Sequence, residues 1–385
     1  MTTDTTVVAP SAPEAVTPEW LTGVLRRAGG IERASVVSVQ AEPLGRGMAG
    51  RIARLTVSYD RPEPGAPSTV VMKLPSSHAS TRALGDRLRI YQREERFYRE
   101  IAQNVPVRVP RAWLADSGPP DFALLLEDAT DARPGDLLRG CSPAEATAVL
   151  AEIARLHAVW WESPALDAES WLPAPNDDIV MSLMQAHGGG AWATFERKFG
   201  AHMGAEIARL GRWLATDRTV LDRLSAPPRT LVHGDLRANN VLFGAGGDVR
   251  ALIDWQTAVQ GRGAIDVANF FVSSLTPPDR RAAEVELLPY YHGLLVEHGV
   301  RGYSLDQCRE DYRLAVANQF AQVVVLSSLL EVDDRLDDGV GSVTGGRLIG
   351  ALLELRAADL APTPARRAPA LARALRRIHR RLTAR

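Results

Sequence analysis

The stretch that decides the fold is LVHGDLRANNVLFGAGGDVRALIDW, residues 231 to 255, which sets two carboxylates and an amide between short apolar runs. The pattern predicts a loop that carries Asp235 and Asn240, followed by a β-hairpin whose second strand, Ala251 to Ile253, ends on Asp254. Such oxygen ligands suit Mg²⁺, which binds through one or two protein groups and completes its shell with substrate phosphates. The stretch therefore predicts a magnesium site for a phosphate-bearing ligand.

The spacing within this loop is that of a known catalytic loop. His233, Asp235 and Asn240 follow the pattern His-x-Asp-x-x-x-x-Asn. In protein kinases the Asp of this pattern accepts the proton of the substrate hydroxyl and the Asn holds a metal ion. The rest of the chain can be tested against that interpretation.

Length and composition exclude several classes of protein. At 385 residues the chain fits two lobes of unequal size, and 45% hydrophobic residues provide a proper core. The 45 basic and 46 acidic residues nearly cancel, which argues against a nucleic-acid binder. Cys141 and Cys308 have no metal or redox spacing and are interpreted as reduced thiols. Polar residues interrupt the apolar segment from Leu314 to Val332, so we expect no membrane span and a cytoplasmic protein.

The first third of the chain predicts a small sheet-based lobe. Residues 1 to 16 are expected to be a flexible leader, and residues 17 to 126 an N-lobe that opens with a helix capped by Thr17. One highly charged helix is expected from Asp86 to Gln103. Alternation and turn residues predict five strands of an antiparallel sheet, at 34–42, 51–59, 69–74, 113–115 and 123–126.

The remaining two thirds of the chain have mainly helical texture. Residues 127 to 139 are expected to form a hinge and crossing segment, and residues 140 to 360 a helical C-lobe, with Ser142 as the cap of its first helix. Residues 361 to 385 form a basic tail, interpreted as a solvated terminal helix. The predicted fold class is therefore α+β, with two lobes.

A glycine motif precedes the second predicted strand. Gly45, Gly47 and Gly50 form G-x-G-x-x-G, which lets backbone N–H groups approach phosphate oxygens without interference from a Cβ atom. Dinucleotide-binding folds use the same glycines, but there the last glycine opens a helix. Here a β-forming segment, Arg51 to Tyr59, follows, as in the glycine flap of a kinase. A glycine-rich hairpin without a ligand remains an alternative.

One lysine ends an otherwise apolar strand. Lys73 follows Gly50 by 23 residues, on the next strand, where a kinase carries the lysine that pairs with the nucleotide phosphates. Its counter-ion is expected on the following helix, where Glu94 and Glu95 both qualify. Glu94 is preferred because it lies three residues before Phe97, which is expected to face the core.

With these residues in place, the chain resembles the aminoglycoside phosphotransferase and choline kinase superfamily, which has the protein-kinase-like fold. Within that superfamily it is most similar to the ecdysteroid-kinase-like branch, a placement that rests on Gln256 after Asp254 and Trp255. The resemblance covers about residues 20 to 360. The segments that carry it are His233 to Asn240, Ile253 to Gln256, Gly263 to Asp266, Leu125 to Asp128, and Tyr290 with Tyr291.

The resemblance implies a role for each matching residue. Asp235 would be the catalytic base, and Arg237 would either touch the transferred phosphoryl group or face solvent. Asn240 and Asp254 would hold Mg²⁺. Three sets of residues would bind ATP: the glycines Gly45, Gly47 and Gly50; the pair Lys73 and Glu94; and the hinge backbone at Leu126, Glu127 and Asp128. His233 and Asp266 would brace the catalytic loop.

The implied function is ATP- and Mg²⁺-dependent phosphorylation of a hydroxyl group on a small molecule, the alcohol acceptor. A nucleotide-binding pseudokinase with a regulatory role is the alternative, and a dinucleotide-dependent oxidoreductase shares only the glycine motif. The residues do not identify the acceptor. Aromatic residues from Trp192 to Trp213 suit an apolar alcohol, whereas the acidic cluster from Glu331 to Asp338 would suit a cationic one. As a helix end, that cluster needs no ligand.

Overall fold

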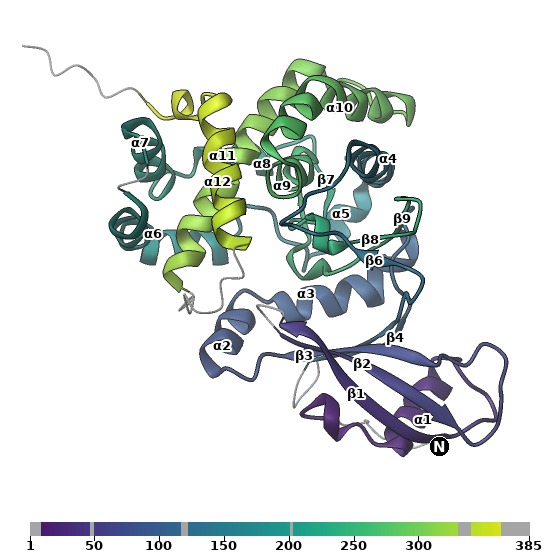
Figure 1. Ribbon diagram of the computed structural model, residues 1–385. Helices are drawn as coiled ribbons and strands as arrows, with labels where there is room; N and C mark the ends of the chain where they lie inside the picture. Colours follow the sequence, from purple (N-terminus) through teal and green to yellow (C-terminus); the bar gives the residue numbers. More distant parts are fainter. Residues whose placement is uncertain (1–8, 47–49, 117–121, 201–202, 330–339, 363–385) are drawn as a thin grey trace, which may run out of the picture.

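The computed structural model describes residues 9–46, 50–116, 122–200, 203–329 and 340–362. Gly47, the acidic cluster of residues 331–338 and residues 363–385 of the tail lie outside these ranges. The described residues form a smaller lobe built on a sheet and a larger helical lobe, with helix α3, Ile90–Arg96, lying between the sheet and the helical lobe (Figure 1). The predicted α+β class with two lobes is confirmed.

The N-lobe is organised around one antiparallel sheet of five strands in the order β1-β2-β3-β5-β4. All five strands were predicted. Their bounds are β1 Val36–Arg46, β2 Gly50–Tyr59, β3 Thr69–Pro75, β4 Ala112–Asp116 and β5 Ala123–Glu127.

Strand β5 shows how the sheet separates two hydrophobic cores. Successive side chains of a strand point to opposite faces. Ala123 and Leu125 pack in the core beneath helix α1, Pro18–Arg27, whereas Leu124 and Leu126 belong to the larger core shared with the C-lobe. Residues 123–126 are all apolar because both faces of the strand are buried there.

The charged segment after β3 differs from the prediction of one helix that begins at Asp86. Helix α2, Ala79–Arg87, comes first, and Arg89 then takes a left-handed conformation with φ 54° before α3 begins. Helix α3 continues into a π-helical turn, Phe97–Ile101. The break was not predicted because nothing in the local sequence, neither Gly nor Pro, marks it.

A hinge segment leads from β5 to the C-lobe. It contains the short strand β6, Arg133–Pro134, and ends at helix α4, Pro143–Val159. Ser142 caps α4 in a capping box with Glu145, as its position before Pro143 predicts. The other helices of the described C-lobe are α5 Pro164–Ala168, α6 Asp178–Phe199, α7 Ala205–Leu214, α8 Thr219–Ser225, α9 Ala264–Ser274, α10 Pro277–Glu297, α11 Leu305–Leu329 and α12 Val340–Glu354.

The stretch from residue 231 to 255 lies in two small antiparallel sheets at the face of the C-lobe that meets the N-lobe (Figure 1). Strand β7, Thr230–Val232, pairs with β10, Val259–Gly261, while β8, Val241–Phe243, and β9, Val249–Leu252, form the predicted hairpin. None of the helices that the structure describes is long and apolar enough to cross a membrane.

Candidate active site

A buried carboxylate binds the backbone of the loop that follows β7. Asp266, on α9, accepts hydrogen bonds from the backbone N–H groups of His233, at 2.7 Å, and Gly234, at 2.9 Å. Asn269, one helical turn later, donates to the carbonyl of Gly234 at 2.9 Å. These contacts place Asp266 where the resemblance implied, as a brace of the loop rather than a group that faces the cleft.

His157 adds a third partner to this brace. Its Nε2 lies 3.2 Å from Asp266 Oδ2, and its Nδ1 lies 2.7 Å from the hydroxyl of Tyr291. All three side chains are buried, so His157 is a packed residue of α4. Its bonds to the loop brace could not be predicted, because His157 and Asp266 are separated by 109 residues.

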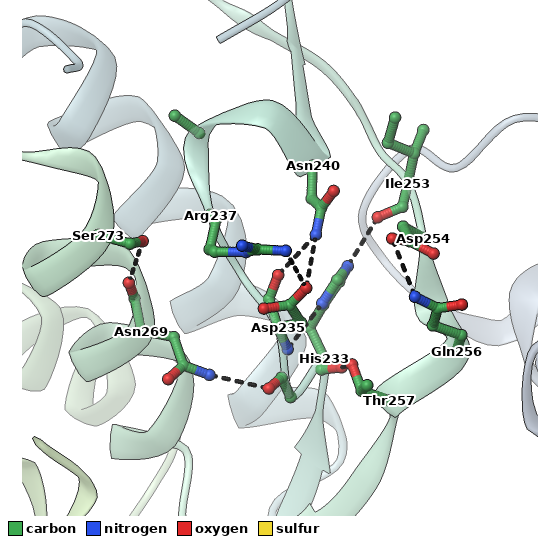
Figure 2. A network of polar contacts seen from close by, with 12 residues as sticks. His233, Asp235, Arg237, Asn240, Ile253, Asp254, Gln256, Thr257, Asn269 and Ser273 are labelled. Carbon is green, nitrogen blue, oxygen red and sulfur yellow. Dashed lines mark hydrogen bonds and ion pairs between the residues drawn. The ribbon is translucent and has the colours of Figure 1, made fainter. Parts of the chain in front are cut away.

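The conformation of the loop depends on His233 and Gly234. His233 Nε2 donates to the carbonyl of Ile253 at 2.9 Å, which leaves Nδ1 as the acceptor for the N–H of Asp235 (Figure 2). Gly234 has φ +83°, and a Cβ atom added there would lie 2.1 Å from the carbonyl oxygen of Thr257. Only glycine therefore fits this position.

Asp235 lies at the centre of a short polar network (Figure 2). Its Oδ2 accepts from Arg237 Nη2 at 2.7 Å and from Asn240 Nδ2 at 3.3 Å. Both contacts use the same oxygen, which leaves Oδ1 for another donor. Burial raises the pKa of Asp235 above its usual range, and the facing Arg237 guanidinium opposes that shift. Arg237 is thus paired with the candidate base and does not simply face solvent.

Lys73 connects the two lobes. Its Nζ lies 2.6 Å from Glu94 Oε2, on α3, and 2.6 Å from Asp254 Oδ1, after β9. Burial alone would lower the pKa of Lys73, but the two carboxylates outweigh it and raise the pKa, so the side chain stays charged. Burial raises the pKa of Glu94, while the nearby ammonium lowers the pKa of Asp254. The preference for Glu94 over Glu95 is consistent with this geometry, since Glu95 pairs with Arg99.

Two side chains supply the oxygens that suit a divalent cation. Asn240 Nδ2 donates to the carbonyl of Asp235 at 2.8 Å, so its Oδ1 is the end that remains for a metal. Asp254, in a left-handed conformation with φ 67°, supplies a partly exposed carboxylate. The described residues contain no group of three or more His, Cys, Asp or Glu side chains that could hold a metal ion. Two protein ligands fit Mg²⁺ only where phosphates complete the shell.

Aromatic stacking fixes the position of α3 against this site. The rings of Phe97 and Trp255 stack at a centroid distance of 4.0 Å and an angle of 7°. Trp255 follows Asp254, and Phe97 follows Glu94 by three residues, so the stack lies beside the Lys73 ion pairs. The buried aromatic face that led to the choice of Glu94 thus packs on the segment that carries Asp254.

The glycine segment joins two antiparallel strands. Gly45 lies in β1 and Gly50 begins β2, with Arg46 opposite Arg51. Gly50 approaches β3 so closely that a Cβ atom would lie 2.6 Å from the carbonyl oxygen of Leu74. Antiparallel strands before and after residues 47–49 agree with the order of elements in a kinase flap, whereas a dinucleotide-binding fold needs a parallel strand followed by a helix.

The hinge residues are bound to the N-lobe by their side chains. Glu127 pairs with Arg108 at 2.7 Å, and Asp128 forms a two-pronged ion pair with Arg54 at 2.6 and 3.1 Å. The N–H of Glu127 donates to the carbonyl of Arg111. Any contact of Leu126, Glu127 or Asp128 with adenine would therefore use the remaining backbone groups, and it stays a prediction.

The aromatic residues between the hinge and the catalytic loop belong mostly to the core. Trp192 and Phe195 are buried, and both pack against Phe320 on α11. Phe199 is the most exposed, at 37%. These side chains do not define an acceptor pocket within the described residues.

Comparison with known proteins supports the fold. A putative aminoglycoside phosphotransferase from Ralstonia eutropha is 15% identical, with a TM-score of 0.52, over 89% of this chain and 98% of that one. Plasmodium vivax ethanolamine kinase is 14% identical, with a TM-score of 0.51, over 88% of this chain and 89% of that one. The predicted resemblance to this superfamily of protein-kinase-like folds is confirmed at the level of the fold.

Other comparisons add less. A thermostable mutant of an aminoglycoside phosphotransferase, solved in ternary complex with ADP and hygromycin B, is 17% identical with a TM-score of 0.48, over 87% of this chain and 97% of that one. The family model DUF1679, described as "Uncharacterized oxidoreductase dhs-27", matches residues 215–338. That range contains the loop with Asp235 and Asn240 and lacks the glycine segment. No curated protein matches the sequence.

Proposed function

We propose that the protein is a small-molecule kinase that transfers a phosphoryl group from ATP, with Mg²⁺, to a hydroxyl group of an alcohol. The observation that carries the proposal is the position of Lys73 Nζ, which lies 2.6 Å from both Glu94 and Asp254, and the Asp254 carboxylate in turn lies near Asp235. A lysine held between two carboxylates is a cation already in position, and it can also form ion pairs with phosphate oxygens.

The nucleotide would bind between the lobes. Lys73, kept charged by Glu94, would pair with its phosphates, and the backbone from Gly45 to Gly50 would cover them. The hinge backbone from Leu126 to Asp128 would contact the base. Asn240 and Asp254 would hold Mg²⁺, which when bound neutralises charge that develops on the phosphates. The ion pair between Lys73 and Asp254 would then weaken, because Lys73 would contact the phosphates and Asp254 would contact Mg²⁺.

Asp235 would orient the acceptor hydroxyl and accept its proton. Because Arg237 and Asn240 both use Oδ2, the hydroxyl would approach from the side of Oδ1. Arg237 opposes the rise that burial causes in the pKa of Asp235, and its guanidinium would also be available to contact the transferred phosphoryl group. Catalysis of this kind comes mainly from positioning and charge stabilisation.

The direct test is a panel of alcohols, among them aminoglycosides, steroids and polyketides, incubated with ATP and Mg²⁺, with product mass as the readout. Asp235→Asn should lower transfer by about 10² to 10⁴-fold and leave nucleotide binding, measured by calorimetry, within about twofold. Wild-type turnover in this variant would contradict the role of Asp235. Binding of ATP without transfer to any acceptor would favour a pseudokinase, and binding of NAD(P) instead of ATP would favour an oxidoreductase.

A further inference from the structure

Both carboxylate oxygens of Asp254 have a protein partner. Lys73 Nζ contacts Oδ1 at 2.6 Å, and the side-chain amide of Gln256 donates from Nε2 to Oδ2 at 3.3 Å (Figure 2). The first contact is an ion pair that the nucleotide would compete for under the proposed function. The second comes from a neutral group two residues further along the chain, and the proposed mechanism assigns no role to it.

The backbone on both sides of Gln256 is firmly held. Trp255 is fully buried in its stack with Phe97, and Thr257 Oγ1 donates to the carbonyl of His233 at 3.2 Å. Residues Trp255–Thr257 form a single 3₁₀ turn. The direction of the Gln256 side chain, back over Asp254, is therefore set by two anchored neighbours.

The other end of the same amide is unsatisfied. Gln256 Oε1 is buried, and no group among the described residues donates to it. A buried acceptor without a partner is unfavourable, so contacts of the oxygen do not explain this orientation of the amide. The hydrogen bond from Nε2 to Asp254 therefore accounts for the orientation of the amide.

A neutral donor is the appropriate partner for a carboxylate that must also attract a cation. A second Lys or Arg at this position would cancel the charge of Asp254, whereas an amide N–H fixes the plane of the carboxylate and leaves its charge unchanged. Groups that orient metal ligands in this way commonly change metal affinity by about 10- to 100-fold.

We propose that Gln256 is a positioning residue for Asp254, and that its amide N–H holds the carboxylate in the orientation in which it binds the divalent cation of the metal–nucleotide complex. The inference rests on the proposed function, because it requires Asp254 to bind a metal. In this role Gln256 would act through Asp254 and would not itself have to contact the metal or the nucleotide.

The test measures metal binding, not turnover. Gln256→Met keeps the length of the side chain and removes the donor. Binding of Mn²⁺ is followed by electron paramagnetic resonance in the presence of a non-hydrolysable ATP analogue, and binding of the analogue without metal is followed by calorimetry. We expect about tenfold weaker Mn²⁺ binding, with metal-free nucleotide binding within about twofold of wild type. The control is Gln103→Met, which removes an exposed amide far along the chain from Asp254.

The possible results distinguish the role of Gln256 from the proposed function. Mn²⁺ binding by Gln256→Met within twofold of wild type would overturn the inference and leave the proposed function intact. Equal loss of metal-free and metal-bound nucleotide would also overturn it, because Gln256 would then act on the nucleotide site as a whole. Failure of the wild-type protein to bind Mn²⁺ with the analogue would instead count against the proposed function.

Discussion

Lys73 and Asp254 are 181 residues apart in the chain, and their side chains meet at 2.6 Å between Nζ and Oδ1. The contact joins a strand of the N-lobe sheet to the end of the hairpin in the C-lobe. Glu94, on the helix between the lobes, contacts the same ammonium. One cation therefore lies between two carboxylates that would otherwise repel each other, and it offsets one of their two negative charges.

Replacement of this cation is expected to affect both stability and nucleotide binding. In Lys73→Met the two carboxylates lose their shared partner, and loss of one member of a buried ion pair costs about 3–5 kcal/mol. Urea denaturation should show this loss, and calorimetry should show at least about tenfold weaker ADP binding. The chain's other lysine, Lys198, is exposed on α6, so Lys198→Met should change neither quantity appreciably. Wild-type stability in Lys73→Met would contradict the ion-pair geometry.

Arg237 is expected to set the lower pH limit of activity. Burial raises the pKa of Asp235, so the carboxylate form needed for proton acceptance is lost at a higher pH than for an ordinary Asp. The guanidinium opposes this shift. Arg237→Gln should therefore raise the pKa of Asp235 further and move the acidic limb of the kcat/KM profile to higher pH. Arg237→Lys, which keeps the charge, should leave the limb closer to wild type.

A control for the pH experiment is Arg155→Gln, since Arg155 pairs with Glu152 on the exposed side of α4. Its profile should match the wild type. An unchanged acidic limb in Arg237→Gln would mean that Arg237 does not control the ionisation of Asp235.

The loop brace is expected to depend on the hydroxyl of Tyr291. Tyr291→Phe leaves the ring in place and removes the partner of His157 Nδ1, which should lower the free energy of unfolding by about 1–3 kcal/mol because a buried polar atom is left unsatisfied. The neighbouring Tyr290 is 38% exposed, so Tyr290→Phe should change stability by less than about 0.5 kcal/mol. Equal effects of the two variants in urea denaturation would argue against the brace.

Gly234→Ala is expected to disrupt the catalytic loop. The left-handed backbone alone costs about 1–3 kcal/mol for a residue with a Cβ atom, and the clash with the carbonyl of Thr257 adds to that cost. Unfolding measurements should show a loss above this range together with loss of turnover.

Gly189 provides the matched control for this variant. It lies inside α6, with no atom within 4 Å of an added Cβ. Gly189→Ala should therefore stabilise the protein by about 0.5–1 kcal/mol. A tolerated Gly234→Ala would show that the loop can adopt another conformation.

Local sequence patterns were sufficient for much of the fold. The apolar run of β5, the turn residues between strands and the Ser142 cap are short-range signals, and the predicted sheet and hairpin follow from them. The single helix predicted from Asp86 was wrong because a left-handed residue at Arg89 has no local signature. The boundaries of the leader, hinge and tail, and the roles of the site residues, stay predictions.

The sequence by itself determined which groups are available: two carboxylates, an amide, a lysine and a glycine segment, in the order of a kinase-like chain. Only the tertiary structure decided which of them meet. Lys73 reaches Asp254, His157 reaches Asp266, and Glu127 and Asp128 pair with arginines of the N-lobe. The physical reason is that such contacts depend on packing between elements distant in the chain, and that packing has no counterpart in local propensity.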